Sequence, residues 1–172
     1  MMGFQATVDC NGRPSNRTVV FRGFVEDSDK IQINTDVRSR KIEELKHSPF
    51  AEICWYLTDT WEQFRIKGTI DIIDGSNPDP VKLQQREKSW FVRSPSSRLV
   101  YLDPGLPYQD EQPLNEAILD PCAGPVDAFC LLILDPEQVD YLNLKSNERL
   151  IFIPRQNDNG ENLCISEKIN PQ

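Results

Sequence analysis

Polar and apolar residues alternate strictly along one segment near the middle of the chain. In WEQFRIKGTIDII, residues 61–73, the polar residues at positions 63, 65, 67, 69 and 71 are separated by apolar residues or glycine. Successive side chains of a β-strand point to opposite faces of its sheet, so a period of two is typical of a half-buried strand. The pattern therefore predicts a long strand with one face toward solvent and the other toward a core.

Several other segments, rich in β-branched and aromatic residues, predict further strands. They are residues 4–9, 17–25, 31–35, 51–57, 126–134, 139–144 and 148–154. Asn11 and Gly12 favour a hairpin turn between the first two of these strands. The sequence DPEQ, residues 135–138, predicts another turn, and we expect the polar residues 160–172 to form a frayed tail.

Two helices interrupt the predicted strands. In NTDVRSRKIEELKHSP, residues 34–49, a turn runs into a short helix. Asp79 and Pro80 are suited to the N-cap and first position of a second helix, which we expect to end near Val92. The residues that follow, 93–125, are rich in proline, glycine and acid and predict a long loop with at most a helical turn at 114–119.

Antiparallel strands with short turns and two interposed helices predict a mainly β fold. We expect a closed or partly closed β-barrel with flanking helices, because closure removes exposed strand edges. The 172 residues, 38% of them hydrophobic, predict a single domain over residues 1–172. A parallel nucleotide-binding sheet is not expected, since the sequence has no GxGxxG or GxxxxGK[ST] loop.

The composition argues against several classes of binding partner, among them nucleic acids, membranes and metal ions. A net charge of −8 argues against a protein that binds nucleic acid or an anionic membrane through a broad basic face. Five cysteines without CxxC spacing, in a sequence with no signal-type apolar run, predict reduced thiols and a cytoplasmic location. No stretch approaches the length of a membrane helix. With His47 as the single histidine, we expect no metal centre.

Three cations lie where the first predicted helix begins. Arg38, Arg40 and Lys41 surround Ser39, which is suited to the N-cap position. The start of a helix carries unpaired N–H groups and a partial positive charge, so acidic side chains stabilise it and cations do not. Two interpretations are open: the cations point away into solvent, or an anion such as a phosphate binds at this helix end together with them.

Four motifs in a fixed order carry a resemblance to a known family. The segments NRTVVFRGF, TDVRSRKIEEL, AEICWY and EQFRIKG together resemble the FMN-binding split-barrel superfamily, and within it the pyridoxamine 5'-phosphate oxidase-related Alr4036 family. The similarity covers most of residues 4–102 and, more weakly, residues 126–155. It implies an antiparallel Greek-key split barrel that binds FMN at the interface of a homodimer.

The resemblance also implies roles for particular residues. Arg17 would reach the FMN phosphate, Val19, Val20 and Phe21 would line the flavin, and Gln63 would hydrogen-bond its polar edge. Ser39, Arg40 and Lys41 match the phosphate cluster of the family. The cofactor-binding residues that the resemblance implies are Arg17, Val19, Val20, Phe21, Arg22, Asn34, Thr35, Ser39, Arg40, Lys41 and Gln63. A bound phosphate would explain the cations at the helix start.

The chain departs from the true oxidase where that enzyme binds its substrate. Leu142 stands in place of the late tryptophan, and no histidine completes an Arg-x-His motif after Arg149. The segment SWFVRSPSSR keeps an aromatic, an arginine and a serine of the earlier substrate region. Candidate substrate residues are Arg22, Trp90, Arg93 and Ser97.

Three functions fit these observations. The first is an FMN-dependent oxidoreductase acting on a small substrate, in which the flavin carries the chemistry. The second is a flavin-binding module without turnover, and the third is a structural barrel without flavin. A true pyridoxamine 5'-phosphate oxidase is a narrower form of the first. Trp55, Trp61 and Trp90 could stack on a ligand, but an aromatic residue on a barrel strand is more often part of the core.

Overall fold

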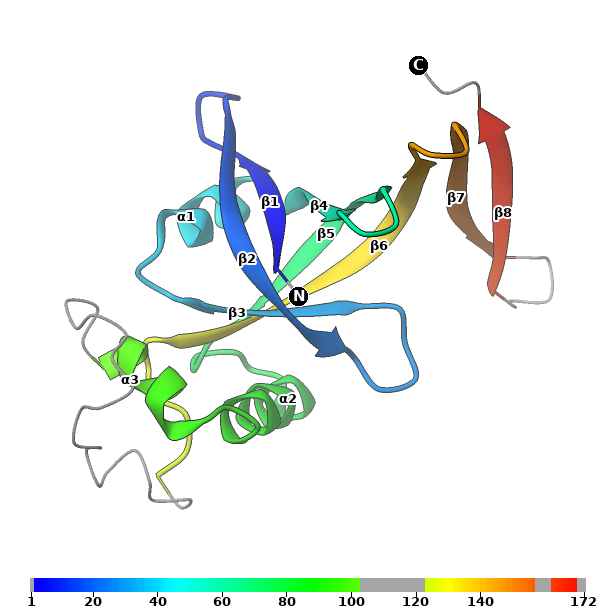
Figure 1. The fold of residues 1–172 in the computed structure, drawn as a ribbon. Coiled ribbons are helices and arrows are strands. Elements are labelled where there is room, and N and C mark those ends of the chain that lie inside the picture. The colour runs from blue at the N-terminus through cyan, green and yellow to red at the C-terminus, as the bar shows by residue number, and fades with distance from the viewer. Residues whose placement is uncertain (1, 103–122, 157–161, 170–172) are drawn as a thin grey trace. The chain divides into compact units, whose positions relative to one another are not determined.

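The computed structural model describes residues 2–102, 123–156 and 162–169, which form eight strands and three helices (Figure 1). In chain order the elements are β1 (Met2–Val8), β2 (Pro14–Phe24), β3 (Ile31–Asp36), α1 (Arg40–His47), β4 (Phe50–Leu57), β5 (Glu62–Ile73), α2 (Pro80–Phe91), α3 (Pro95–Leu102), β6 (Phe129–Asn143), β7 (Glu148–Gln156) and β8 (Asn162–Ile169). None of the helices in these ranges is long and apolar enough to cross a membrane.

The strands form one sheet in the order β3-β2-β1-β4-β5-β6-β7-β8, and a further pairing joins β3 to β6. This additional pairing closes the first six strands into an antiparallel barrel, as the sequence predicts. The first three predicted strands pair in chain order: Gln5 pairs with Arg17 across β1 and β2, and Phe21 pairs with Ile33 across β2 and β3.

The chain divides into two compact units by its internal contacts. Unit 1 comprises residues 1–33, 43–71 and 133–172 and holds most of the strands, while unit 2 comprises residues 34–42 and 72–132 and holds α2 and α3. The expectation of a single domain stays a prediction.

The core of unit 1 comes from strand faces with the predicted alternation. On β5, Ile66, Gly68 and Ile70 are buried while Lys67 between them is exposed. Ile31, Ile33 and Ile53, on neighbouring strands, are also almost fully buried. The core of unit 2 is aromatic: Trp90, Tyr101 and Phe129 pack edge to face, with ring centroids 5.1–6.0 Å apart.

The predicted turn at residues 135–138 is wrong. β6 runs without interruption from Phe129 to Asn143, and its second half pairs with β7. Asp-Pro favours a turn locally, but pairing of β6 with β5, β3 and β7 outweighs that preference. Gly68 accommodates the passage, because a Cβ at this position would collide with the Asp135 carbonyl oxygen.

The predicted loop after residue 92 contains a helix, α3, that the sequence reading missed. The signal was present, because Ser94 and Pro95 repeat the cap-then-proline arrangement of Asp79 and Pro80. Burial of Tyr101 against Trp90 then stabilises the helix. The helical turn expected at 114–119 lies outside the described residues.

The C-terminal segment is also more regular than predicted. Residues expected to fray include β8, which pairs antiparallel with β7 from Arg149↔Ile169 to Gln156↔Asn162. The second helix, in contrast, agrees with its prediction: α2 starts at Pro80, and the Asp79 side chain accepts a hydrogen bond of 2.8 Å from the Val81 N–H.

Candidate functional site

Strand β2 carries five of the residues that the resemblance assigns to cofactor binding. Their burial alternates along the strand: Arg17 and Phe21 are half-buried and Val19 is buried, whereas Val20 and Arg22 are exposed. Side chains of adjacent strand residues point to opposite faces. The side chains of Val19 and Val20 therefore cannot line the same face of a flavin, although the strand backbone can lie along it.

Arg17 belongs to a buried polar cluster within unit 1. Its guanidinium donates to the Thr7 hydroxyl and, at 2.6 Å, to Glu44 Oε2, and Thr7 Oγ1 donates to the same carboxylate oxygen at 2.5 Å. Gln5 pairs with Arg17 in the strand register and is fully buried, and its side-chain amide has no hydrogen-bond partner in the described part of the chain. The cluster holds Arg17 in one orientation.

Hydrogen bonds decide the charge state of Glu44. Burial by itself would raise the pKa of this carboxyl, but the bonds from Thr7 and Arg17 outweigh burial and hold the pKa below its usual value. Glu44 is therefore ionised at neutral pH, and it forms a partly buried ion pair with Arg17, whose side chain is 22% exposed.

A second polar group lies within unit 2, at the end of β3 and the start of α1. Lys41 Nζ donates a hydrogen bond of 2.9 Å to Thr35 Oγ1, and the hydroxyls of Thr35 and Ser39 lie 3.3 Å apart. Asn34 accepts a hydrogen bond of 2.9 Å from Ser89 Oγ. The structure thus brings together three residues expected to bind the cofactor, and their side chains offer two hydroxyls and an ammonium group.

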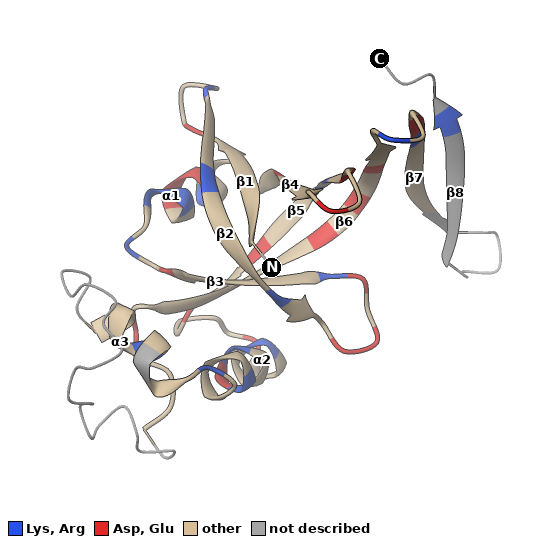
Figure 2. Cartoon of the chain, in the orientation of Figure 1, with Lys and Arg blue, Asp and Glu red and all other residues tan. Residues whose placement is uncertain are grey.

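One of the three cations at this helix start is explained by an internal ion pair. Arg38 donates to both carboxylate oxygens of Asp36, at 2.5 and 2.8 Å, and to the Tyr101 carbonyl at 3.1 Å. Burial would raise the pKa of Asp36, but the bonds from Arg38 lower it overall. Arg40 is exposed, and α1 and the turn before it carry cations and acids in close succession (Figure 2). Arg38 therefore supports neither of the two interpretations, and the phosphate interpretation rests on Arg40 and Lys41.

The chemistry of the Thr35, Ser39 and Lys41 group fits a phosphate. Phosphate oxygens accept strong hydrogen bonds from cations, hydroxyls and the backbone N–H groups at a helix start, and all three kinds of donor occur here. Gln63, the residue assigned to the flavin edge, lies half-buried on β5 of unit 1, opposite Tyr56 of β4.

The candidate substrate residues divide between the units. Arg22 is exposed on β2 of unit 1, and the other three lie in unit 2. Trp90 is only 2% exposed and belongs to the aromatic core, so its burial accounts for it without a ligand. Arg93 Nη2 donates to the Ser97 carbonyl at 3.0 Å, and its guanidinium lies 5.1 Å from the Tyr101 ring centroid. Their role toward a substrate stays a prediction.

The other two tryptophans are in different environments. Trp55 on β4 packs edge to face against Phe21, with centroids 5.2 Å apart, and a Cβ at Gly3 would collide with its indole. Trp61 is 49% exposed and adopts a positive φ of 64° at the turn before β5. The aromatic contact of Trp55 is therefore a packing contact within unit 1.

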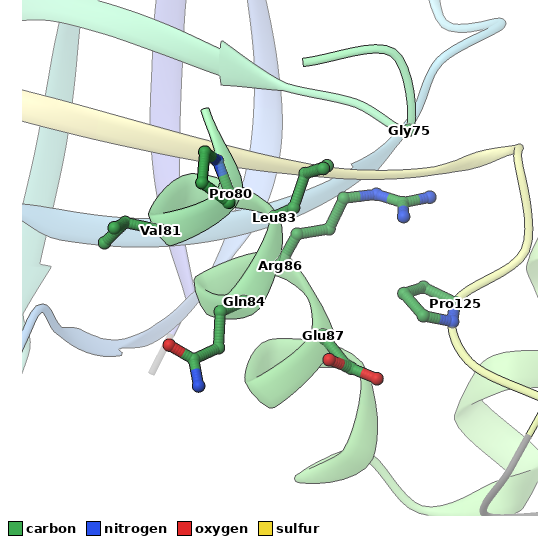
Figure 3. Close-up of a pocket in the computed structure, with 8 residues that line it drawn as sticks. All are labelled: Gly75, Pro80, Val81, Leu83, Gln84, Arg86, Glu87 and Pro125. Carbon is green, nitrogen blue, oxygen red and sulfur yellow. The ribbon is translucent and has the colours of Figure 1, made fainter. Parts of the chain in front are cut away.

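Two arginines outside the predicted set are also placed by the fold. Arg86 on α2 is 5% exposed and borders a hollow of about 630 Å³ in unit 2 (Figure 3). It donates to the carbonyls of Val126 at 2.7 Å and Phe129 at 2.9 and 3.0 Å, and its burial lowers the pKa of the guanidinium. No spacing or motif distinguishes Arg86 in the sequence, since its partners are backbone groups some 40 residues away.

Arg149, which precedes the missing histidine, forms an ion pair within unit 1. It donates to both oxygens of Asp140, at 2.7 and 3.0 Å, and Arg65 binds the same carboxylate. Asp140 is 3% exposed. The guanidinium of Arg149 is therefore hydrogen-bonded to a buried carboxylate in this structure.

Comparisons with known proteins place the chain in a family. Residues 3–74 match the model of the "Pyridoxamine 5'-phosphate oxidase, FMN-binding domain". The chain is 63% identical over 168 residues to "Pyridoxine/pyridoxamine 5'-phosphate oxidase 2" of Arabidopsis thaliana, covering 96% of this chain and 85% of that protein.

Two solved structures resemble this chain in fold. A pyridoxamine 5'-phosphate oxidase-related, FMN-binding protein of Nostoc punctiforme superposes with a TM-score of 0.81 at 40% identity, covering 99% of this chain and 87% of that one. PhzG from Burkholderia lata superposes with a TM-score of 0.67 at 20% identity, covering 99% and 81%, and shares the fold. The chain therefore belongs to the pyridoxamine 5'-phosphate oxidase-related family of FMN-binding split-barrel proteins.

Proposed function

We propose that the protein binds FMN and acts as an oxidoreductase on a small substrate. The observation that carries the proposal is the group formed by Thr35, Ser39 and Lys41 at the start of α1, whose donors suit a phosphate. The Nostoc relative, 40% identical to this chain, is an FMN-binding protein. When bound, FMN supplies the electron transfer.

The chain's own residues bind and orient the cofactor in this proposal. Thr35, Ser39, Arg40 and Lys41 hold the phosphate from the helix start, and Arg17 adds a cation from β2. Val19 and Phe21 offer apolar side chains to the flavin, and Gln63 donates to the polar edge of the ring. The remaining proposed cofactor-binding residues are Val20, Arg22 and Asn34. A donor near that edge favours the reduced, anionic flavin.

We also propose that the protein is a homodimer with FMN at the subunit interface. Unit 1 exposes several large apolar side chains: Met2 (70%) and Phe4 (55%) on β1, and Val20 (36%) and Phe24 (56%) on β2. Met2 and Val20 are direct cross-strand partners, so these two exposed apolar side chains lie next to each other. A second copy of the chain is the partner that the proposal requires.

Two kinds of substrate are compatible with the proposed oxidoreductase. The Arabidopsis relative is named a pyridoxine/pyridoxamine 5'-phosphate oxidase, and 63% identity favours the same substrate here. The hydrogen bonds from Arg149 to Asp140, together with Leu142 at the place of the oxidase tryptophan, favour a different small substrate. A flavin-binding module without turnover is the non-catalytic alternative.

The experiment is turnover by the FMN-loaded protein in air. Hydrogen peroxide release is measured with pyridoxamine 5'-phosphate, with pyridoxine 5'-phosphate and without substrate. Release that depends on either phosphate ester supports the oxidase candidate. A flavin that is reduced by light and reoxidised only at the rate of free FMN, whatever the small molecule added, would leave the non-catalytic module as the function.

A further inference from the structure

The family resemblance assigns Arg17 to the cofactor but gives no role to Glu44, its ion-pair partner. Glu44 is 7% exposed, and a single oxygen, Oε2, accepts from both Thr7 and Arg17. All three residues belong to unit 1: Thr7 on β1, Arg17 on β2 and Glu44 on α1. The cluster therefore ties three separate elements to one carboxylate.

Stability alone is a weak reason for such a cluster. Taking a carboxylate and a guanidinium out of water costs several kcal/mol per ion, and well-packed apolar residues of similar volume are often as stabilising. A buried ion pair does, however, fix the direction of its members. The planar guanidinium of Arg17 is held at two of its nitrogens, Nη1 by Thr7 and Nη2 by Glu44.

The remaining hydrogens of Arg17 are then aimed by the first two bonds. A guanidinium carries five N–H donors in a fixed plane. Thr7 and Glu44 take two of them, which leaves three pointing in directions set by the cluster. An arginine oriented before its ligand arrives loses less conformational entropy when it binds a phosphate.

We infer that Glu44 is a positioning residue: together with Thr7 it orients Arg17 for the phosphate group of the flavin. The inference rests on the proposed function, because it assigns Arg17 to the FMN phosphate. Glu44 itself does not contact the ligand in this account. Its low pKa keeps it charged, and therefore able to orient Arg17, throughout the neutral range.

Simple electrostatics predicts the opposite effect, which makes the inference testable. A carboxylate beside Arg17 cancels part of its charge and repels a phosphate. If cancellation dominated, removing the Glu44 charge would tighten FMN binding. If orientation dominates, as we infer, removal weakens it.

The experiment measures dissociation constants of FMN and of riboflavin, which lacks the phosphate, by flavin fluorescence with the apo-protein. Glu44→Gln keeps the shape of the side chain and removes its charge. Glu43→Gln is the matched control, because Glu43 is the neighbouring acid on α1 and is exposed. We expect Glu44→Gln to weaken FMN binding by about tenfold, the effect of one charge-assisted hydrogen bond, and to leave riboflavin binding unchanged. Glu43→Gln should behave as wild type.

A double-mutant cycle separates positioning from general damage to the fold. In an Arg17→Ala background, Glu44→Gln should no longer change the FMN constant, because Glu44 acts through Arg17. Unchanged or tighter FMN binding by Glu44→Gln, or equal losses for FMN and riboflavin, would overturn the inference and leave the proposed function intact. A wild-type protein that binds neither flavin would contradict the proposed function, and the inference with it.

Discussion

The ammonium group of Lys41 donates a 2.9 Å hydrogen bond to the hydroxyl of Thr35, and so ties the first turn of α1 to the end of β3. A lysine at a helix start is otherwise unfavourable, because it faces the positive end of the helix dipole. The bond to Thr35 offsets part of this cost within unit 2. A phosphate bound by the same two residues would offset the remaining unfavourable interaction between Lys41 and the helix dipole.

The first prediction concerns this lysine. Lys41→Ala should weaken FMN binding by about 2 kcal/mol, since it removes one charge-assisted contact to the phosphate. Lys46→Ala, an exposed lysine of the same helix, is the control and should leave the constant unchanged. Titration of the apo-proteins with FMN provides the measurement. Equal affinity of wild type and Lys41→Ala would remove Lys41 from the site.

The second prediction concerns the close approach of β5 and β6. Gly68→Ala should lower the free energy of unfolding by about 1–3 kcal/mol, because the added methyl group would overlap the Asp135 carbonyl oxygen. Gly75→Ala is the control: a Cβ there meets its nearest atom at an ordinary distance of 3.7 Å. Urea unfolding of both variants and of the wild type measures these free energies of unfolding. A Gly68→Ala protein as stable as wild type would mean that β6 does not run past Gly68 as described.

The third prediction concerns the buried guanidinium of α2. Arg86→Met should destabilise the protein by about 2–3 kcal/mol, since the buried Phe129 carbonyl would lose its guanidinium donor and the Val126 carbonyl would keep only the Phe129 N–H. Lys88→Met, at an exposed position of the same helix, should cost little. Thermal unfolding distinguishes the two. Similar small losses in both variants would show that water replaces the guanidinium.

The fourth prediction concerns stability in acid. The hydrogen bonds from Arg149 and then from Arg65 hold the pKa of Asp140 below its usual value, although burial opposes them. The folded pKa is lower than the unfolded one, so the stabilisation is present above the unfolded pKa, about 3.9, and is lost as the pH falls through the folded pKa. Asp140→Asn should therefore lower stability at neutral pH and flatten the acid limb of the stability curve.

The measurement is thermal unfolding between about pH 7 and about pH 2. Asp29→Asn, at an exposed turn position, is the control and should keep the wild-type curve. An Asp140→Asn variant whose acid limb falls as steeply as that of wild type would exclude Asp140 as a source of acid sensitivity.

The fifth prediction concerns the apolar surface of β1 and β2. Phe4→Lys should convert the dimer to a monomer, because it places a charge in an apolar interface without a partner. Val92→Lys, at an isolated position 88% exposed in unit 2, should leave the oligomeric state unchanged. Light scattering after size-exclusion chromatography measures the mass. A monomeric wild-type protein would contradict the proposed dimer.

The sequence predicts the barrel well because its strands have strong local signals. The alternation along residues 61–73 fixes β5 and its buried face, and Asp79 with Pro80 fixes the start of α2. The prediction of a turn at DPEQ is wrong because the pairing of β6 with its neighbouring strands outweighs the local turn preference. The helix α3 is not predicted, because the proline and glycine residues near it favour a loop locally.

The candidate site was predictable only in part. The grouping of Thr35, Ser39 and Lys41 follows from a strand running directly into a helix, which sequence reasoning can anticipate. The ion pairs of Arg38 with Asp36 and of Arg17 with Glu44 differ in this respect. The first joins residues two apart and could have been inferred, whereas the second joins residues 27 apart and depends on the register of the barrel.

The central claim is that this chain holds FMN. The most direct measurement is an absorbance spectrum from about 300 to 550 nm, the range of the flavin bands, of the purified protein before and after loading with FMN and desalting. We predict a flavin band that survives desalting in the wild type and is lost in Arg17→Ala. A protein that stays colourless after loading would contradict the account.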